Sequence, residues 1–177
     1  RSSLPGSRLP LDAAGTRPVR PRGVGRVLRA QLDNRLEQET TIHWHGIALR
    51  NDMDGVPGLT QPAVASGDSF GYDFTVPDAG TYFFHPHVGT QLDRGLYAPL
   101  IVEDPADGSD YDLEAVLVLD DWLDGVAGDP DRELERLRSE GMSMGGMSMS
   151  APTAQSPLGG DTGDVSYPYY LINGKIG

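Results

Sequence analysis

The stretch Thr41–Gly46, TIHWHG, places two histidines two positions apart, on either side of a tryptophan. The stretch Thr81–Val88, TYFFHPHV, repeats this spacing around a proline. All four histidines of the chain fall in these two pairs, His43 with His45 and His85 with His87. Residues two apart on a β-strand point to the same face, so each pair projects together from its strand.

Two such pairs on facing strands bring four imidazoles together, and neutral imidazole binds copper, zinc, iron and nickel. Histidines that point in pairs hold one ion or two, and ions of two-metal sites lie about 3.5–4 Å apart. The residue between each pair points the other way, which places Trp44 in the core and makes Pro86 a stiffener of its strand. A single buried histidine is more often held by hydrogen bonds, but two pairs that use every histidine indicate a metal site. The ligand set alone leaves copper and zinc open.

Alternating apolar and polar residues predict strands over much of the chain. Short strands about 8–12 residues apart, with turn residues between them, predict an all-β sandwich or barrel. The expected strands are 28–32, 40–49, 69–76, 81–87, 100–102 and 114–119, the last of them fully buried.

The 177 residues carry a formal net charge of −12, which argues against a nucleic-acid partner because phosphate contacts need a basic face. No apolar run is long enough to span a membrane, and no signal peptide is recognised at the start. The absence of cysteine excludes disulfides, thiolate metal sites and thiol nucleophiles.

Composition predicts four regions. Residues 1–23, with four prolines, form an N-terminal arm, and residues 24–124 form the main β domain. Residues 125–164 hold a short surface helix near 132–139 and a flexible loop or linker rich in glycine, serine and methionine. Residues 165–177 read as the start of a further β domain, and we expect the chain to be truncated there.

The segments Thr40–Phe74 and Pro77–Pro105 resemble the first domain of multicopper oxidases of the laccase-like, three-domain bacterial type. The resemblance extends over about half of the chain, from Arg26 to Leu123, and the last residues are similar to the entry into the second domain. It implies a cupredoxin-like Greek-key β-sandwich.

The resemblance also implies the roles of individual residues. His43 would bind the type 2 copper of a trinuclear cluster, and the type 3 copper pair would be bound by His45, His85 and His87. Asp54 would supply protons during the reduction of dioxygen. The alternative explanation of Asp54 is turn formation, because Asp-Gly is a common turn pair.

A type 1 copper needs a cysteine thiolate, which this chain lacks. We therefore expect the type 1 copper in other cupredoxin domains, in the same polypeptide or in a second chain. Dioxygen and a reducing substrate, either a phenolic compound or Cu(I), are the other expected partners. The resemblance implies an extracytoplasmic location, secreted or periplasmic.

Four of the five methionines lie in one short run, GMSMGGMSMS, as Met142, Met144, Met147 and Met149. Thioethers are soft ligands that select Cu(I), and the surrounding glycines and serines let the chain wrap an ion. Capture of Cu(I) is one interpretation, and a low-complexity linker without a metal is the other.

Three hypotheses of function follow. The first is a part of a multicopper oxidase that reduces dioxygen to water. The second is a non-catalytic copper-binding or storage protein. The third is a mononuclear metalloenzyme of the cupin type, which the residues after His45 (GIALRND) disfavour because they lack the usual glutamate.

Overall fold

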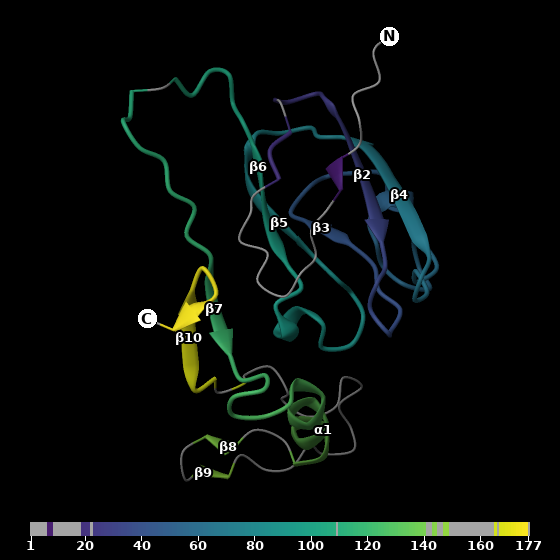
Figure 1. Ribbon diagram of the computed structural model, residues 1–177, viewed down its shortest axis with the longest axis vertical. Helices are drawn as coiled ribbons and strands as arrows, with labels where there is room; N and C mark the ends of the chain where they lie inside the picture. Colours follow the sequence, from purple (N-terminus) through teal and green to yellow (C-terminus); the bar gives the residue numbers. More distant parts are fainter. Residues whose placement is uncertain are drawn as a thin grey trace. The chain divides into compact units, whose positions relative to one another are not determined.

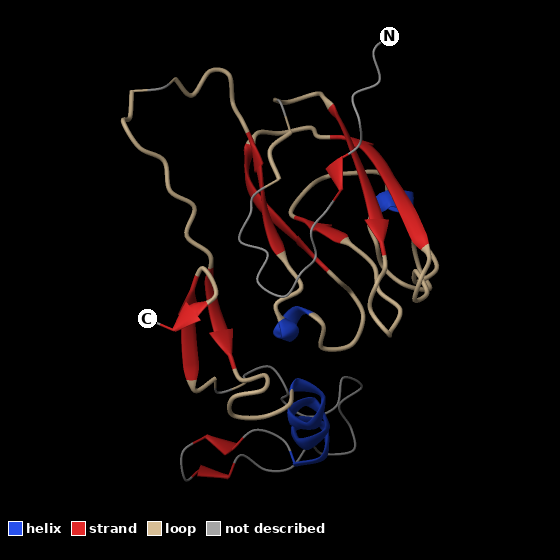
Figure 2. Ribbon diagram, in the orientation of Figure 1, coloured by secondary structure: helices blue, strands red, loops and turns tan. Residues whose placement is uncertain are grey.

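The computed structural model describes residues 19–21, 23–108, 110–140 and 167–176, together with residues 7–8, 143–144, 147–148 and 165. The chain divides into two compact units, Arg1–Val118 and Leu119–Gly177. Most of the regular structure is β-strand, as Figures 1 and 2 show, so the prediction of an all-β fold is confirmed. The predicted domain boundaries at residues 24 and 124 remain predictions.

The first unit contains two three-stranded sheets. One sheet has the order β1-β2-β4, with bounds Ser7–Arg8, Val27–Asp33 and Ser69–Thr75. The other has the order β3-β5-β6, with bounds His43–His45, Gly80–His85 and Ala98–Val102. β1 runs parallel to β2, and the other pairs are antiparallel. Two short 3₁₀ helices, η1 (Asn51–Met53) and η2 (Leu92–Arg94), lie in the connecting loops.

The two sheets of the first unit share one hydrophobic core. β2 alternates strictly between exposed and buried positions, as its sequence predicts. Trp44 of β3 is completely buried, and its ring lies 5.4 Å from Tyr72, 5.1 Å from Phe74 and 5.3 Å from Phe84. These rings come from both sheets, so the core of a β-sandwich holds β3 in place from behind, and the predicted burial of Trp44 is confirmed.

The second unit contains a three-stranded sheet of order β11-β10-β7, with bounds Lys175–Ile176, Tyr169–Ile172 and Leu119–Trp122. Helix α1 (Pro130–Glu140) contains the predicted surface helix, and Asp129 caps it by accepting the N–H of Asp131 at 2.9 Å. The short strands β8 (Ser143–Met144) and β9 (Met147–Ser148) pair with each other. None of the described helices has the length and apolar character needed to cross a bilayer.

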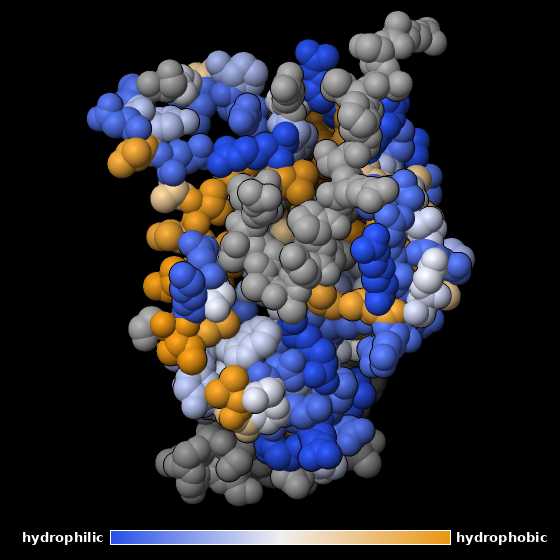
Figure 3. Space-filling view, in the orientation of Figure 1, coloured by the Kyte–Doolittle hydropathy of each residue, from blue (hydrophilic) through white to orange (hydrophobic). Residues whose placement is uncertain are grey.

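The prediction of a buried strand over residues 114–119 is wrong. Only Leu119 belongs to a strand, β7, and the exposed fractions of Leu117 and Leu119 are 67% and 73%. Figure 3 shows apolar side chains at the surface along the segment that leads into β7. An apolar run favours burial, but it does not determine which part of the protein covers it. Among the described residues, β7 pairs with one strand, β10.

Candidate metal centre

The pairing of β3 with β5 sets the positions of three of the four histidines. The strands are antiparallel, with His43 opposite His85, Trp44 opposite Phe84 and His45 opposite Phe83. Because side chains alternate between the faces of a sheet, the histidines project from the face opposite to the tryptophan core. His87 follows two residues after the end of β5.

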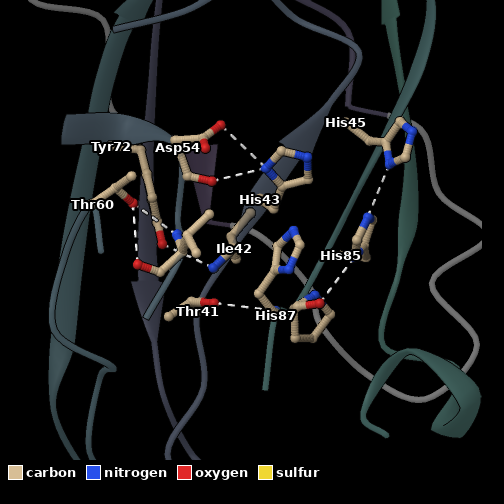
Figure 4. A network of polar contacts seen from close by, with 11 residues as sticks. Thr41, Ile42, His43, His45, Asp54, Thr60, Tyr72, His85 and His87 are labelled. Carbon is tan, nitrogen blue, oxygen red and sulfur yellow. Dashed lines mark hydrogen bonds and ion pairs between the residues drawn. The ribbon is translucent and has the colours of Figure 1, made fainter. Parts of the chain in front are cut away.

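The structure brings all four predicted histidines together, as Figure 4 shows. The ring centroid of His43 lies 5.6 Å from that of His45, 5.3 Å from that of His85 and 4.6 Å from that of His87. The His85 ring is also 5.3 Å from both His45 and His87.

The separations between ring nitrogens suit metal ligands. His43, His85 and His87 each offer a nitrogen within 4.8 Å of the others. His45 Nδ1 lies 3.1 Å from His85 Nε2. Two imidazole nitrogens that bind the same tetrahedral ion, each at 2.0–2.1 Å, are about 3.3 Å apart. The donor set and its spacing therefore fit copper held by imidazole.

The orientation of His43 is set by Asp54. His43 Nδ1 lies 2.9 Å from the Asp54 carbonyl oxygen and 3.3 Å from the carboxylate oxygen Oδ1. Both oxygens accept hydrogen bonds, so Nδ1 carries the proton and donates it to them, which leaves the lone pair of Nε2 for a metal.

His85 is oriented in the same way by a carbonyl. Its Nδ1 lies 2.9 Å from the oxygen of Pro86, so Nδ1–H donates and the Nε2 lone pair faces His45. Burial is the main cause that lowers the pKa of His85, and the neighbouring histidines lower it further, against the opposing effect of the Pro86 carbonyl. Burial also lowers the pKa of His87. Both imidazoles are thus favoured in the neutral form that binds metal.

Asp54, the predicted acidic residue, lies at the cluster. Its side chain is 31% exposed, and it reaches His43 from the loop that follows η1. The structure thus places the carboxylate beside the ring that Asp54 also orients through its carbonyl (Figure 4).

Sequence reasoning missed two residues that contact the histidines. Thr41 is completely buried, and its Oγ1 accepts the backbone N–H of His87 at 3.2 Å. The Phe83 ring stacks on His45 at 4.5 Å with 23° between the planes, and on His85 at 5.1 Å. Phe83 stands two positions before His85, so the strand period itself places it on the histidine face.

The predicted Cu(I)-capture residues are only partly described. Met142 and Met149 lie outside the described residues. Met144 and Met147 are backbone partners in the β8–β9 pair. Capture of Cu(I) by this segment remains a prediction.

Residues 23–107 match the profile of a family described as multicopper oxidase. The chain is 47% identical over 160 residues to the multicopper oxidase MmcO of Mycobacterium tuberculosis, across 86% of this chain and 31% of that protein. It is 38% identical over 117 residues to the copper resistance protein A homolog of Pseudomonas syringae pv. tomato, across 66% of this chain and 19% of that protein. The chain thus spans 31% of the length of the first relative and 19% of the second.

The fold is similar to that of solved structures of multicopper oxidases. A crystal structure of a multi-copper oxidase from Pseudomonas thermotolerans aligns with a TM-score of 0.64 and 31% identity. The alignment covers 93% of this chain and 35% of that one.

Proposed function

The chain contains a cupredoxin-like domain of the multicopper oxidase family, and from this premise we propose that its four histidines are half of the ligands of a trinuclear copper cluster. The domain would occupy residues 24–124, and residues 165–177 would begin a second domain. The single observation that carries the proposal is the convergence of both histidine pairs, with ring nitrogens of His45 and His85 at 3.1 Å.

We assign His43 to the type 2 copper and the other three histidines to the type 3 pair. The different surroundings of the rings support this assignment. His43 alone is held by Asp54, whereas His45 and His85 direct nitrogens toward each other. His43 and His85 each present an Nε2 lone pair that a copper ion would take, and His45 would offer Nδ1 once its proton is on Nε2.

The whole protein would oxidise a reducing substrate and reduce dioxygen to water. Copper, when bound, supplies the transfer of electrons from that substrate to dioxygen. Each oxygen atom also gains protons as it gains electrons, and Asp54 would supply protons near the cluster. Its carboxylate is in contact with His43 on one side and is partly open to solvent.

The type 1 copper would be held elsewhere, because the 177 residues include no cysteine and all four histidines are already assigned. We propose that further cupredoxin domains supply it, in the same polypeptide or in a second chain. The greater length of the relatives supports this proposal.

The reducing substrate would be Cu(I) or a phenolic compound. The similarity to a copper resistance protein supports Cu(I), and so does the run of methionines. An extracytoplasmic location is proposed on the family resemblance. The cupin hypothesis is set aside because residues 23–107 match a different family.

Copper uptake by the 177-residue chain tests the proposal. We expect Cu(II) to remain bound after dialysis at pH 7, and His43→Gln together with His85→Gln to abolish the uptake. Met144→Leu with Met147→Leu is the matched control, because thioethers are poor ligands for Cu(II). Uptake that is unchanged by the histidine substitutions would overturn the assignment.

A further inference from the structure

The loop after η1 passes directly over the strand that carries the first histidine pair, and Gly55 is the residue at the crossing. The φ angle of Gly55 is +77°, in the left-handed region that favours glycine. A Cβ atom at this position would overlap the carbonyl group of Ile42 and lie 2.9 Å from the backbone nitrogen of His43. The loop reaches β3 this closely only because residue 55 has no side chain.

The β3 side of this contact is held in place. Ile42 is completely buried, and its backbone N–H donates to the hydroxyl of Tyr72 at 2.9 Å. Trp44, two residues further, is also completely buried. A displacement of Ile42 would break a buried hydrogen bond and disturb the core.

The loop side is held by its own hydrogen bonds, but it is more open to solvent. The Asp54 N–H donates to the carbonyl of Asn51 at 3.2 Å, and the Val56 N–H donates to Thr60 Oγ1 at 2.8 Å. Asp54, the residue before Gly55, is half-buried. A side chain at position 55 would therefore displace the loop rather than the strand, and Asp54 would move with it.

We propose that Gly55 is a positioning residue for the pair His43 and Asp54. Its close contact with Ile42 holds the Asp54 carbonyl 2.9 Å from His43 Nδ1, which fixes the ring proton on Nδ1 and turns Nε2 toward the metal. The same contact holds the carboxylate 3.3 Å from that nitrogen. The inference rests on the proposed function, which makes His43 a copper ligand. The tautomer of the His43 ring is nevertheless measurable without copper.

The test compares Gly55→Ala with Gly58→Ala. Gly58 lies in the same loop with a φ of +73°, and a Cβ there meets nothing within 4 Å. Both substitutions impose the same kind of backbone strain, but only Gly55→Ala adds the clash with β3. Gly58→Ala is therefore the matched control.

The readout is the tautomer of His43 in the metal-free chain, from long-range ¹H–¹⁵N spectra of the imidazole nitrogens. We expect the Nδ1–H form in the native chain and in Gly58→Ala, and a mixture of tautomers in Gly55→Ala. His85, whose Nδ1 is held by Pro86, is the internal reference. We also expect the affinity for Cu(II) to fall about 10- to 100-fold in Gly55→Ala, the usual effect of losing a partner that orients a ligand.

The inference is overturned if Gly55→Ala keeps both the Nδ1–H tautomer of His43 and the Cu(II) affinity of Gly58→Ala. Thr60→Val replaces Gly55→Ala if the latter does not fold, because it releases the Val56 N–H without adding a clash. It should lower the Nδ1–H fraction of His43, and an unchanged fraction would also overturn the inference. A tautomer shift in a chain that binds no copper would uphold the role of Gly55 and reject the proposed function.

Discussion

The Nδ1 atom of His45 lies 3.1 Å from the Nε2 atom of His85, although 40 positions separate the two residues in the sequence. Nδ1 of His85 donates to the carbonyl of Pro86, so its Nε2 carries a lone pair. The two facing nitrogens therefore share either a proton or a metal ion. A metal ion in this position requires the other neutral tautomer of His45, with the proton on Nε2 and the lone pair on Nδ1.

Phe83→Leu is expected to weaken copper binding through His45. The Phe83 ring stacks on His45, and an aromatic pair contributes about 0.5–1.5 kcal/mol beyond its buried area, which predicts a loss of about two- to tenfold in Cu(II) affinity. Phe70→Leu is the matched control, because Phe70 packs on Tyr72 at 4.7 Å in the other sheet. Titration with Cu(II) measures the effect, and equal affinities for the two variants would contradict the role given to Phe83.

Thr41→Val is expected to remove a hydrogen bond that holds the backbone of His87 in place, and so to weaken the binding of copper. The substitution keeps the shape of the buried side chain but leaves the His87 N–H without its acceptor, at a cost of about 1 kcal/mol. Thr40→Val is the control, since Thr40 is equally buried but donates to Gln91 at 2.7 Å. Urea unfolding should show similar losses of stability for both. Only Thr41→Val should weaken the binding of copper, and a matching loss in Thr40→Val would argue against a specific effect on His87.

The stability of the metal-free chain is expected to fall as the pH falls. Burial lowers the pKa of His85 and His87 in the folded chain below the value of about 6.5 in the unfolded chain. The unfolded chain then binds more protons, so this stability is present above about pH 6.5 and is lost as the pH falls through the folded pKa values.

Urea unfolding between pH 8 and pH 5 in the presence of a chelator measures this dependence. The midpoint should fall with the pH, and it should fall less in His85→Gln. A midpoint that rises as the pH falls would show that the histidines are not buried as neutral rings.

Asp54→Asn is expected to separate the two roles of Asp54. The backbone carbonyl that orients His43 remains, so copper binding should change little. The carboxylate is lost, and general acid catalysis contributes about 10²–10⁴-fold in typical enzymes, so dioxygen reduction by the complete oxidase should slow at least about 100-fold. Steady-state oxygen uptake with matched copper content checks this. An unchanged rate of dioxygen reduction would contradict a role of the carboxylate in proton supply and would limit it to the structure of the loop.

The sequence predicts the local geometry within each histidine pair, but it does not predict that the two pairs lie close together. The two-residue period alone places His43 with His45 on one face and Trp44 on the other. Which strand lies opposite is a long-range property, and the pairing of His43 with His85 depends on the register of two strands joined by a long connection.

The sequence also does not predict the contacts of the loop that follows η1. Asp-Gly is a common turn pair, and nothing in its composition shows that Gly55 lies against Ile42 or that Asp54 turns toward His43. The run over residues 114–119 fails for a related reason. Its apolar composition indicates a buried strand, but burial requires a covering partner that the run does not encode.

Anomalous diffraction at the copper absorption edge, from crystals of the copper-loaded chain, tests the central claim most directly. We predict copper bonded to Nε2 of His43 and copper bonded between Nδ1 of His45 and Nε2 of His85. Copper found only at other residues, or no ordered copper in fully loaded crystals, would contradict the assignment of these histidines as half of the cluster.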